Sequence, residues 1–283
     1  MRKITYLLAL LAAGSAFAQE DCNLQYDGNG DGAVNIEDVL GILSEFGETC
    51  ESETEASPCG LESSVSYYGY DYQIVAIGDQ CWFAENLRTE RYANGDSIPS
   101  QLSDSDWFST ANGAVAVFGE DEGCESYSTE GDGCDPEWSL DQFGRLYNWY
   151  AVNDSRGLCP SGWHVPTDSA YMILEIELGV PEWEVGYSGW RGTTQGFDLK
   201  ATYSWALSGS EFNTNSTGFS ALSSGERRPS GYFGGLGLNG YWWTSTSGGT
   251  NYAFYRELGG PLGGISRGND QKIHGWNVRC LKD

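Results

Sequence analysis

The chain is poor in several residues on which common binding and catalytic sites depend. Its 283 residues include two histidines, two methionines and only 15 Lys and Arg against 40 Asp and Glu, which gives a formal net charge of −25. Nucleic-acid binding needs a basic face toward the phosphates, so this charge balance argues against nucleic acid as a partner. The acidity suits divalent cations and an extracellular setting, although a well-solvated surface is the simpler explanation.

Long apolar runs are missing after the first 18 residues. Within residues 1–18, two basic residues are followed by a mostly apolar run over 4–13 and by Ala-Phe-Ala at 16–18. This pattern is typical of a secretory signal peptide and is too short for a membrane span; a buried N-terminal helix is the alternative. We therefore expect a secreted or cell-surface protein without a membrane span.

Catalytic signatures are also missing or incomplete. The single G-x-S-x-G match, at 264–268, lies in a glycine-rich stretch without a helical pattern behind it, which argues against a nucleophile elbow. Glycoside hydrolysis needs two facing carboxylates, and no spacing among the 40 acidic residues singles out a pair. His164 lies between Trp163 and Val165, which favours a structural role, and His274 has no accompanying motif. We predict no catalytic residue, and an enzyme remains the less favoured hypothesis.

No C-x-x-C motif occurs among the eight cysteines, so a zinc site or a thioredoxin-like centre is not indicated. An even number of cysteines in an exported chain indicates disulfides, with 105 possible pairings for eight. Three expected pairs each enclose a local segment, and the fourth ties the middle of the chain to its C-terminal end. The expected pairs are Cys22–Cys50, Cys59–Cys81, Cys124–Cys134 and Cys159–Cys280.

A predicted calcium loop dominates a first module, residues 22–50. Between Asp27 and Asp38, oxygen-bearing residues stand at alternate positions, and Gly32 occupies the sixth position, where the loop turns sharply. This spacing lets a twelve-residue loop surround one large cation with hard ligands. The expected Ca2+ ligands are Asp27, Asn29, Asp31, the Ala33 carbonyl, Asn35 and Asp38. A metal-free acidic turn is the alternative.

Asp at the twelfth position with Asn at the ninth resembles one repeat of a type I dockerin. Dockerins normally carry two repeats, so the resemblance implies calcium binding but does not support cohesin binding. A module of about 30 residues cannot build a full core. The expected Cys22–Cys50 bridge would contribute about 3–4 kcal/mol, and calcium the rest. Residues 51–58 are polar and acidic and are predicted to be a linker.

From Cys59 to the end, the sequence predicts one domain (59–283) with enough residues for a core. Residues 70–77 are predicted to be a strand from their β-branched and aromatic content. A capping box at 103–106 predicts a short helix. We expect a second short helix over 146–152, and a third that begins at Thr167 or Asp168 and ends near Leu178.

Ordered motifs in this domain resemble a known family. They are the stretch GRLYNWYAVNDSRGLCPSGWHVPTD at 144–168, the pattern G-x-Q-x-W-x-x-x-N-L at 78–87, and later blocks at 198–200, 218–222, 225–228, 241–246 and 276–283. Together they resemble the Fibrobacter succinogenes major paralogous domain, a family of secreted bacterial domains, over about residues 65–283. The resemblance implies an α+β, C-type-lectin-like fold with a small irregular antiparallel sheet, two helices and long loops. Glu85 and Asn86 are then expected to be buried polar groups bonded to backbone.

The resemblance does not extend to the sugar site of true C-type lectins. Those lectins use a Glu-Pro-Asn or Gln-Pro-Asp loop and a Trp-Asn-Asp strand around calcium, whereas neither loop triplet occurs here and Val278 follows Trp276-Asn277. Exposed aromatic rings could instead stack on sugars, with core packing as the commoner role of such rings. The rings considered are those of Tyr67, Tyr68, Tyr232 and Trp242.

A second calcium site is conceivable in the acidic, glycine-rich insert 119–137, with a disulfide-pinned solvated loop as the favoured alternative. The acidic residues considered as its ligands are Glu120, Asp121, Glu122, Asp132 and Asp135. For the whole chain we expect a secreted, calcium-binding extracellular or cell-surface protein with a non-catalytic module that binds glycan or protein. The alternatives are an enzyme acting on extracellular polysaccharide and a structural matrix component.

Overall fold

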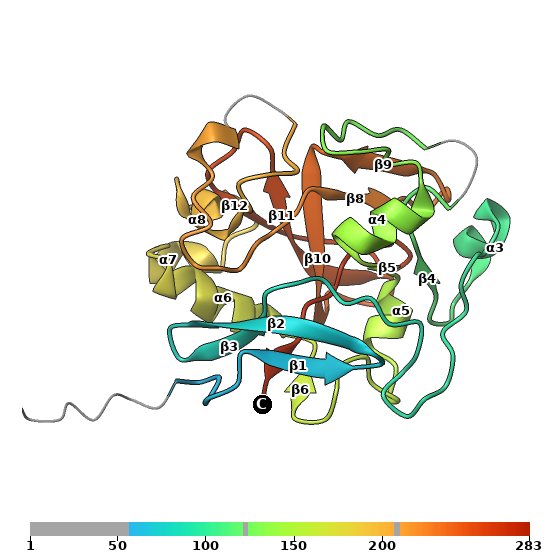
Figure 1. Cartoon of the computed structure of the whole chain (residues 1–283), viewed down its shortest axis with the longest axis horizontal. Coiled ribbons are helices and arrows are strands. Elements are labelled where there is room, and N and C mark those ends of the chain that lie inside the picture. The colour runs from blue at the N-terminus through green and yellow to red at the C-terminus, as the bar shows by residue number, and fades with distance from the viewer. Residues whose placement is uncertain (1–56, 121–123, 207–209) are drawn as a thin grey trace, which may run out of the picture. The chain divides into compact units, whose positions relative to one another are not determined.

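A computed structural model describes residues 57–120, 124–206 and 210–283 (Figure 1). Residues Ser57–Asp283 form one compact unit. The predicted signal peptide, the calcium loop with its six ligands, the Cys22–Cys50 bridge and most of the linker lie outside the described residues.

A six-stranded sheet forms the centre of the domain (Figure 1). Its strands, in spatial order, are β7 (Gly189–Arg191), β12 (Ile265–Gln271), β11 (Tyr252–Gly259), β10 (Asn239–Ser247), β8 (Ser224–Arg227) and β9 (Phe233–Leu236). Neighbours pair antiparallel except β10 and β8, which are parallel. Because side chains alternate along a strand, consecutive residues such as Tyr241 and Trp242 belong to opposite faces.

A second sheet, of five strands, includes the C-terminal strand of the chain. Its order is β1 (Ser64–Tyr67), β2 (Tyr70–Ile77), β3 (Gln80–Phe83), β13 (Leu281–Lys282) and β6 (Trp163–His164). A small third sheet pairs β4 (Val115–Ala116) with β5 (Leu146–Tyr147). The predicted strand 70–77 is therefore confirmed as β2.

The described helices are short, and four of them begin at a side-chain cap. The helices are α3 (Asp104–Ser109), α4 (Pro136–Phe143), α5 (Trp149–Val152), α6 (Asp168–Glu177), α7 (Glu182–Val185), α8 (Gln195–Leu199) and the 3-10 turn η2 (Ser210–Phe212). Ser103 caps α3 and Thr167 caps α6, each by accepting a backbone N–H three residues ahead, as the sequence predicts.

Two expectations about secondary structure are corrected. The helix predicted over 146–152 begins only at Trp149, because the Asn148 side chain accepts the Ala151 N–H at 3.0 Å and caps the helix there. Residues 146–147 pair as β5 instead. The fold is mixed α and β, as expected, but its sheets of five and six strands exceed the small sheet anticipated.

Three disulfides link the domain, and they are the three pairs expected from the sequence for this region: Cys59–Cys81, Cys124–Cys134 and Cys159–Cys280. No cysteine in the described ranges is free. Such bonds persist mainly in oxidising, extracellular compartments. Within residues 57–120, 124–206 and 210–283, no helix is both long and apolar enough to cross a bilayer.

Buried ion pairs fasten α6 to one face of the central sheet. Glu175 accepts from Arg191 Nη1 and from Arg256 Nε, each at 2.5 Å, and its side chain is 1% exposed. Asp168 accepts from Arg256 Nη1 and Arg267 Nη2, each at 2.7 Å. Burial alone would raise the pKa of Asp168, but hydrogen bonds and charge from the two guanidinium groups hold it below its ordinary value.

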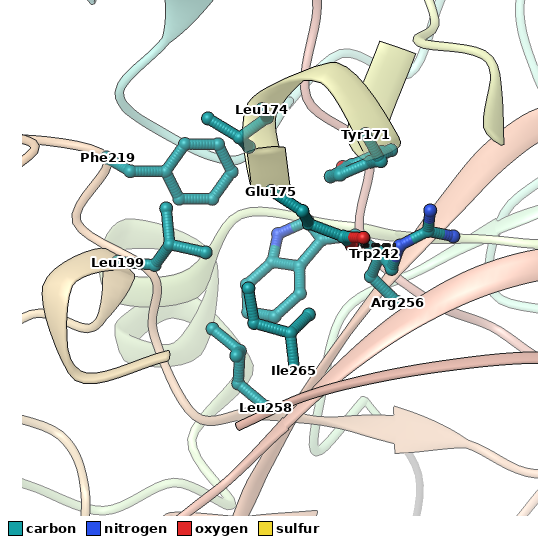
Figure 2. Close-up of a pocket in the computed structure, with 9 residues that line it drawn as sticks. All are labelled: Tyr171, Leu174, Glu175, Leu199, Phe219, Trp242, Arg256, Leu258 and Ile265. Atoms are coloured by element: carbon teal, nitrogen blue, oxygen red, sulfur yellow. Dashed lines mark hydrogen bonds and ion pairs between the residues drawn. The ribbon is translucent and has the colours of Figure 1, made fainter. Parts of the chain in front are cut away.

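Apolar packing fills the rest of this face (Figure 2). Leu174, Trp242 and Leu258 are among the residues that surround a cavity of about 10 Å³ next to the Glu175–Arg256 pair. A space of this size holds at most one water, so this face is core and offers no ligand site.

Candidate functional site

The opposite face of the central sheet carries partly exposed aromatic and acidic side chains. Tyr241 of β10 is opposite Glu257 of β11, and Tyr255 lies two residues before Glu257 on the same face. The aromatic–acidic face, as we name it, consists of Glu226, Tyr241, Tyr255, Glu257, Asp270 and His274 around Trp276.

Trp276 is the floor of this face, and it is 2% exposed. The Tyr241 ring stacks on it at a centroid distance of 5.3 Å and 14°, and the His274 ring at 4.7 Å and 24°. Tyr255 tilts against it at 4.4 Å. Backbone hydrogen bonds in both directions between Trp276 and Tyr147 fix the floor to β5. The rings above it are therefore held in defined positions.

A glycine allows Tyr255 to lie over the neighbouring strand. Gly268 of β12 is its cross-strand partner, and a Cβ at that position would come 2.8 Å from the Tyr255 ring. Any other residue would have to displace the ring, because real Cβ contacts are longer. The ring therefore covers the β12 backbone.

The pKa values of the two glutamates of this face are shifted in opposite directions. Glu226 accepts from His274 Nδ1 at 3.1 Å and from Trp276 Nε1 at 3.0 Å. Burial would raise the Glu226 pKa, but these hydrogen bonds lower it below its ordinary value. Glu257 accepts from Asn239 at 2.9 Å, and burial, together with the charge of Glu226, raises its pKa.

The tyrosine hydroxyls stay protonated at neutral pH. Burial, followed by the charge of Glu257, raises the pKa of Tyr255 to about 12, and the same causes raise that of Tyr241. The face therefore offers hydroxyl donors, carboxylate acceptors and aromatic rings side by side. Divergent carboxyl pKa values are also what an acid–base pair requires, so catalysis remains a second hypothesis.

The aromatic rings nominated from the sequence do not form this site. Trp242 is 1% exposed and donates its indole N–H to Asn86 Oδ1 at 2.9 Å, so it is a core residue. Tyr68 is exposed, whereas Tyr67 is half-buried and bonded to the Leu158 carbonyl. Tyr232 is also half-buried.

The structure also shows the contacts of other residues that the sequence singled out. Asn86 is buried, as expected, and donates to the Phe143 carbonyl at 3.0 Å. Glu85 accepts the Gln73 N–H at 3.1 Å but is only partly buried, which corrects the expectation that it is buried. His164 contacts Asp283 at 2.6 Å on the surface. Ser266, the centre of the G-x-S-x-G match, is buried inside strand β12, so no nucleophile elbow exists there.

Three of the acidic residues considered for a second calcium site are described, and each has a protein partner. Asp132 accepts the Cys134 N–H, Asp135 caps α4, and Glu120 pairs with Arg227 at 2.8 Å. Asp121 and Glu122 lie outside the described residues. Across the described ranges, no three His, Cys, Asp or Glu side chains are grouped to hold a metal.

Sequence reasoning missed His274 and the aromatic–acidic face. His274 has no local motif because its partner Glu226 is 48 residues away. Tyr241, Glu257 and Trp276 come from separate segments that only strand register brings together. One usable signal was the Tyr241-Trp242-Trp243 run, since alternation must direct its rings to both faces of a strand.

These features define a disulfide-linked, mainly β domain whose partly exposed candidate site lies on one face of the central sheet. The model of the Fibrobacter succinogenes major domain matches residues 75–282, and the chain belongs to this family. The resemblance drawn from the motifs is thereby confirmed for the family. No curated protein and no solved structure matched the chain in the same comparisons.

Proposed function

We propose that this chain is a secreted, non-catalytic binding protein whose aromatic–acidic face holds a glycan. The observation that carries the proposal is the arrangement of Tyr241 and Tyr255, partly exposed and fixed on Trp276, beside the carboxylates of Glu226 and Glu257. Sugars present apolar C–H faces that stack on aromatic rings, and hydroxyls that pair with carboxylates and phenols. The face supplies both kinds of contact.

The negative charge of this face favours glycans without acidic groups as its ligands. The negative charges of Glu257, Asp270 and Glu226 all contribute to raising the pKa of Tyr255, so the three carboxylates lie near the same ring. Two like charges about 5 Å apart repel by about 3 kcal/mol at an effective dielectric constant of about 20. Uronate or sulfate groups would therefore be disfavoured relative to neutral sugars.

The C-type-lectin-like fold and the extracellular location belong to the same proposal. Motif resemblance supports the fold, and the disulfides support an oxidising compartment. An extracellular protein ligand is a less specific alternative. A polysaccharide-cleaving enzyme is the second candidate function, supported by the opposite pKa shifts of Glu226 and Glu257.

The test is retention of the full chain on columns of neutral and acidic polysaccharides, first with calcium and then with a chelator, while reducing ends are assayed. Retention on a neutral glycan without release of reducing ends supports the proposal. Release of reducing ends supports the enzyme instead. Retention on none of the glycans contradicts the proposal and directs the search to protein ligands or to a matrix role.

Calcium binding by the 27–38 loop is a separate prediction. Replacing both Asp27 and Asp38 by alanine removes the first and last side-chain ligands of the loop, so high-affinity calcium uptake should disappear in calorimetric titration. Unchanged tight uptake by the double variant would place the calcium elsewhere. Retention on glycan should survive this change, because the proposed sugar face lies in the other part of the chain.

A further inference from the structure

We propose that the aromatic–acidic face extends across the sheet to Trp190, so that its ligand is a linear chain of several sugar units and not a single sugar. This inference rests on the proposed glycan binding and adds the form of the ligand to it. It is carried by strand register, by the exposure of Trp190 and by the distance between the aromatic residues at the two ends.

Register places four residues in one row on one face. Tyr241 of β10 pairs with Glu257 of β11, Glu257 pairs with Ser266 of β12, and Ser266 pairs with Trp190 of β7. Cross-strand partners point to the same side of a sheet, so all four belong to the face that carries Tyr255. We call this set the Trp190 row.

Trp190 is the exposed end of the row. Its side chain is 44% exposed, whereas its neighbour Arg191 is buried on the opposite face in the ion pair with Glu175. The indole also lies over Gly259 of β11, where an added Cβ would come 3.2 Å from the ring. Glycine at this position lets the ring rest on the sheet, as Gly268 does for Tyr255.

Polar groups occupy the interval between the two aromatic ends. Asn239 is the cross-strand partner of Gly259 and donates its amide to Glu257 at 2.9 Å. Hydrogen-bonding groups flanked by aromatic rings match a polysaccharide chain, whose hydroxyls repeat between stackable faces.

The span of the row sets the size of the ligand. Three strand intervals separate the backbones of Trp190 and Tyr241, which is about 14 Å at about 4.8 Å per interval. One monosaccharide cannot contact both ends, whereas an extended oligosaccharide laid across the strands can. Affinity should therefore increase with chain length until both rings are covered.

The experiment is a calorimetric titration of the full chain with cello-, xylo- and manno-oligosaccharides, from disaccharide to hexasaccharide. For at least one series we expect the hexasaccharide to bind at least about tenfold more tightly than the disaccharide. Trp190→Ala should remove this gain, so that hexasaccharide affinity falls much more than disaccharide affinity. Trp190→Phe, which keeps a ring, should retain part of the gain.

Trp183→Ala is the matched control, because Trp183 is another exposed tryptophan, on α7 and outside the row. It should leave the affinity for every length unchanged, and melting temperatures will confirm that each variant is folded. Equal affinity at all lengths, or an equal loss at all lengths in folded Trp190→Ala, would overturn the inference while leaving glycan binding intact. Absence of binding at every length would overturn both proposals.

Discussion

Replacing Glu175 by glutamine is expected to lower the free energy of unfolding by about 3–5 kcal/mol. Glu175 is the carboxylate shared by Arg191 and Arg256, and the side chains of all three are at most 2% exposed. Glutamine keeps the size of the side chain but removes its charge, so two buried guanidinium groups lose their common counter-ion. The cost arises because water cannot reach them to compensate.

The corresponding change in melting temperature should be a decrease of about 10 °C for a domain of this size. Glu177→Gln, on the same helix but exposed, makes the same chemical change where solvent screens the charge. Its melting temperature should stay within about 2 °C of the parent. Equal small effects of the two variants would mean that the buried network does not fasten α6 to the sheet.

Removing the Cys159–Cys280 disulfide with a double alanine variant is expected to cost about 5 kcal/mol of stability. The bond joins residues 121 apart in sequence, and it ties the segment before β6 to the residue before β13. In the chain-entropy account, a longer closed loop restricts the unfolded chain more strongly.

The Cys124–Cys134 pair provides the matched control. Its residues are 10 apart, so the same double alanine change should cost only about 3 kcal/mol. Denaturant unfolding of the two variants, compared with the parent, measures the difference directly. A larger loss from the short loop than from the long one would contradict the loop-closure explanation.

Local signals predicted the parts of the fold that local chemistry determines. Helix α6 follows from the Thr167 cap and from the inward spacing of Tyr171 and Leu174. Two described disulfides, Cys59–Cys81 and Cys124–Cys134, follow from the way that the cysteines enclose local segments, whereas Cys159–Cys280 was expected as a tie between the middle of the chain and its C-terminal end. The strand over 70–77 could be predicted because its composition is strongly β-forming, and the structure confirms it as β2.

Features that depend on strand register could not be predicted. Tyr241, Trp242 and Trp243 are consecutive aromatic residues, so no polar alternation shows which of them faces solvent. Trp242 is buried against Asn86, while Tyr241 is partly exposed, and pairing with β11 decides between them. Similarly, Trp190 joins the face only through its pairing with Ser266, 76 residues later in the numbering.

The measurement that tests the central claim most directly is calorimetric binding of a neutral oligosaccharide to the full chain and to Tyr255→Ala. Tyr255 and Tyr252 lie on β11 but on opposite faces, so Tyr252→Ala is the control for a lost tyrosine. Glu257→Gln is a second variant, which preserves the shape of the side chain should Tyr255→Ala prove unstable.

We predict that Tyr255→Ala weakens binding at least about tenfold, a loss of about 1.4 kcal/mol, and that Glu257→Gln also weakens it. Tyr252→Ala should bind like the parent. Parental affinity in folded Tyr255→Ala and Glu257→Gln variants would show that the sugar binds elsewhere, and would contradict the assignment of the aromatic–acidic face.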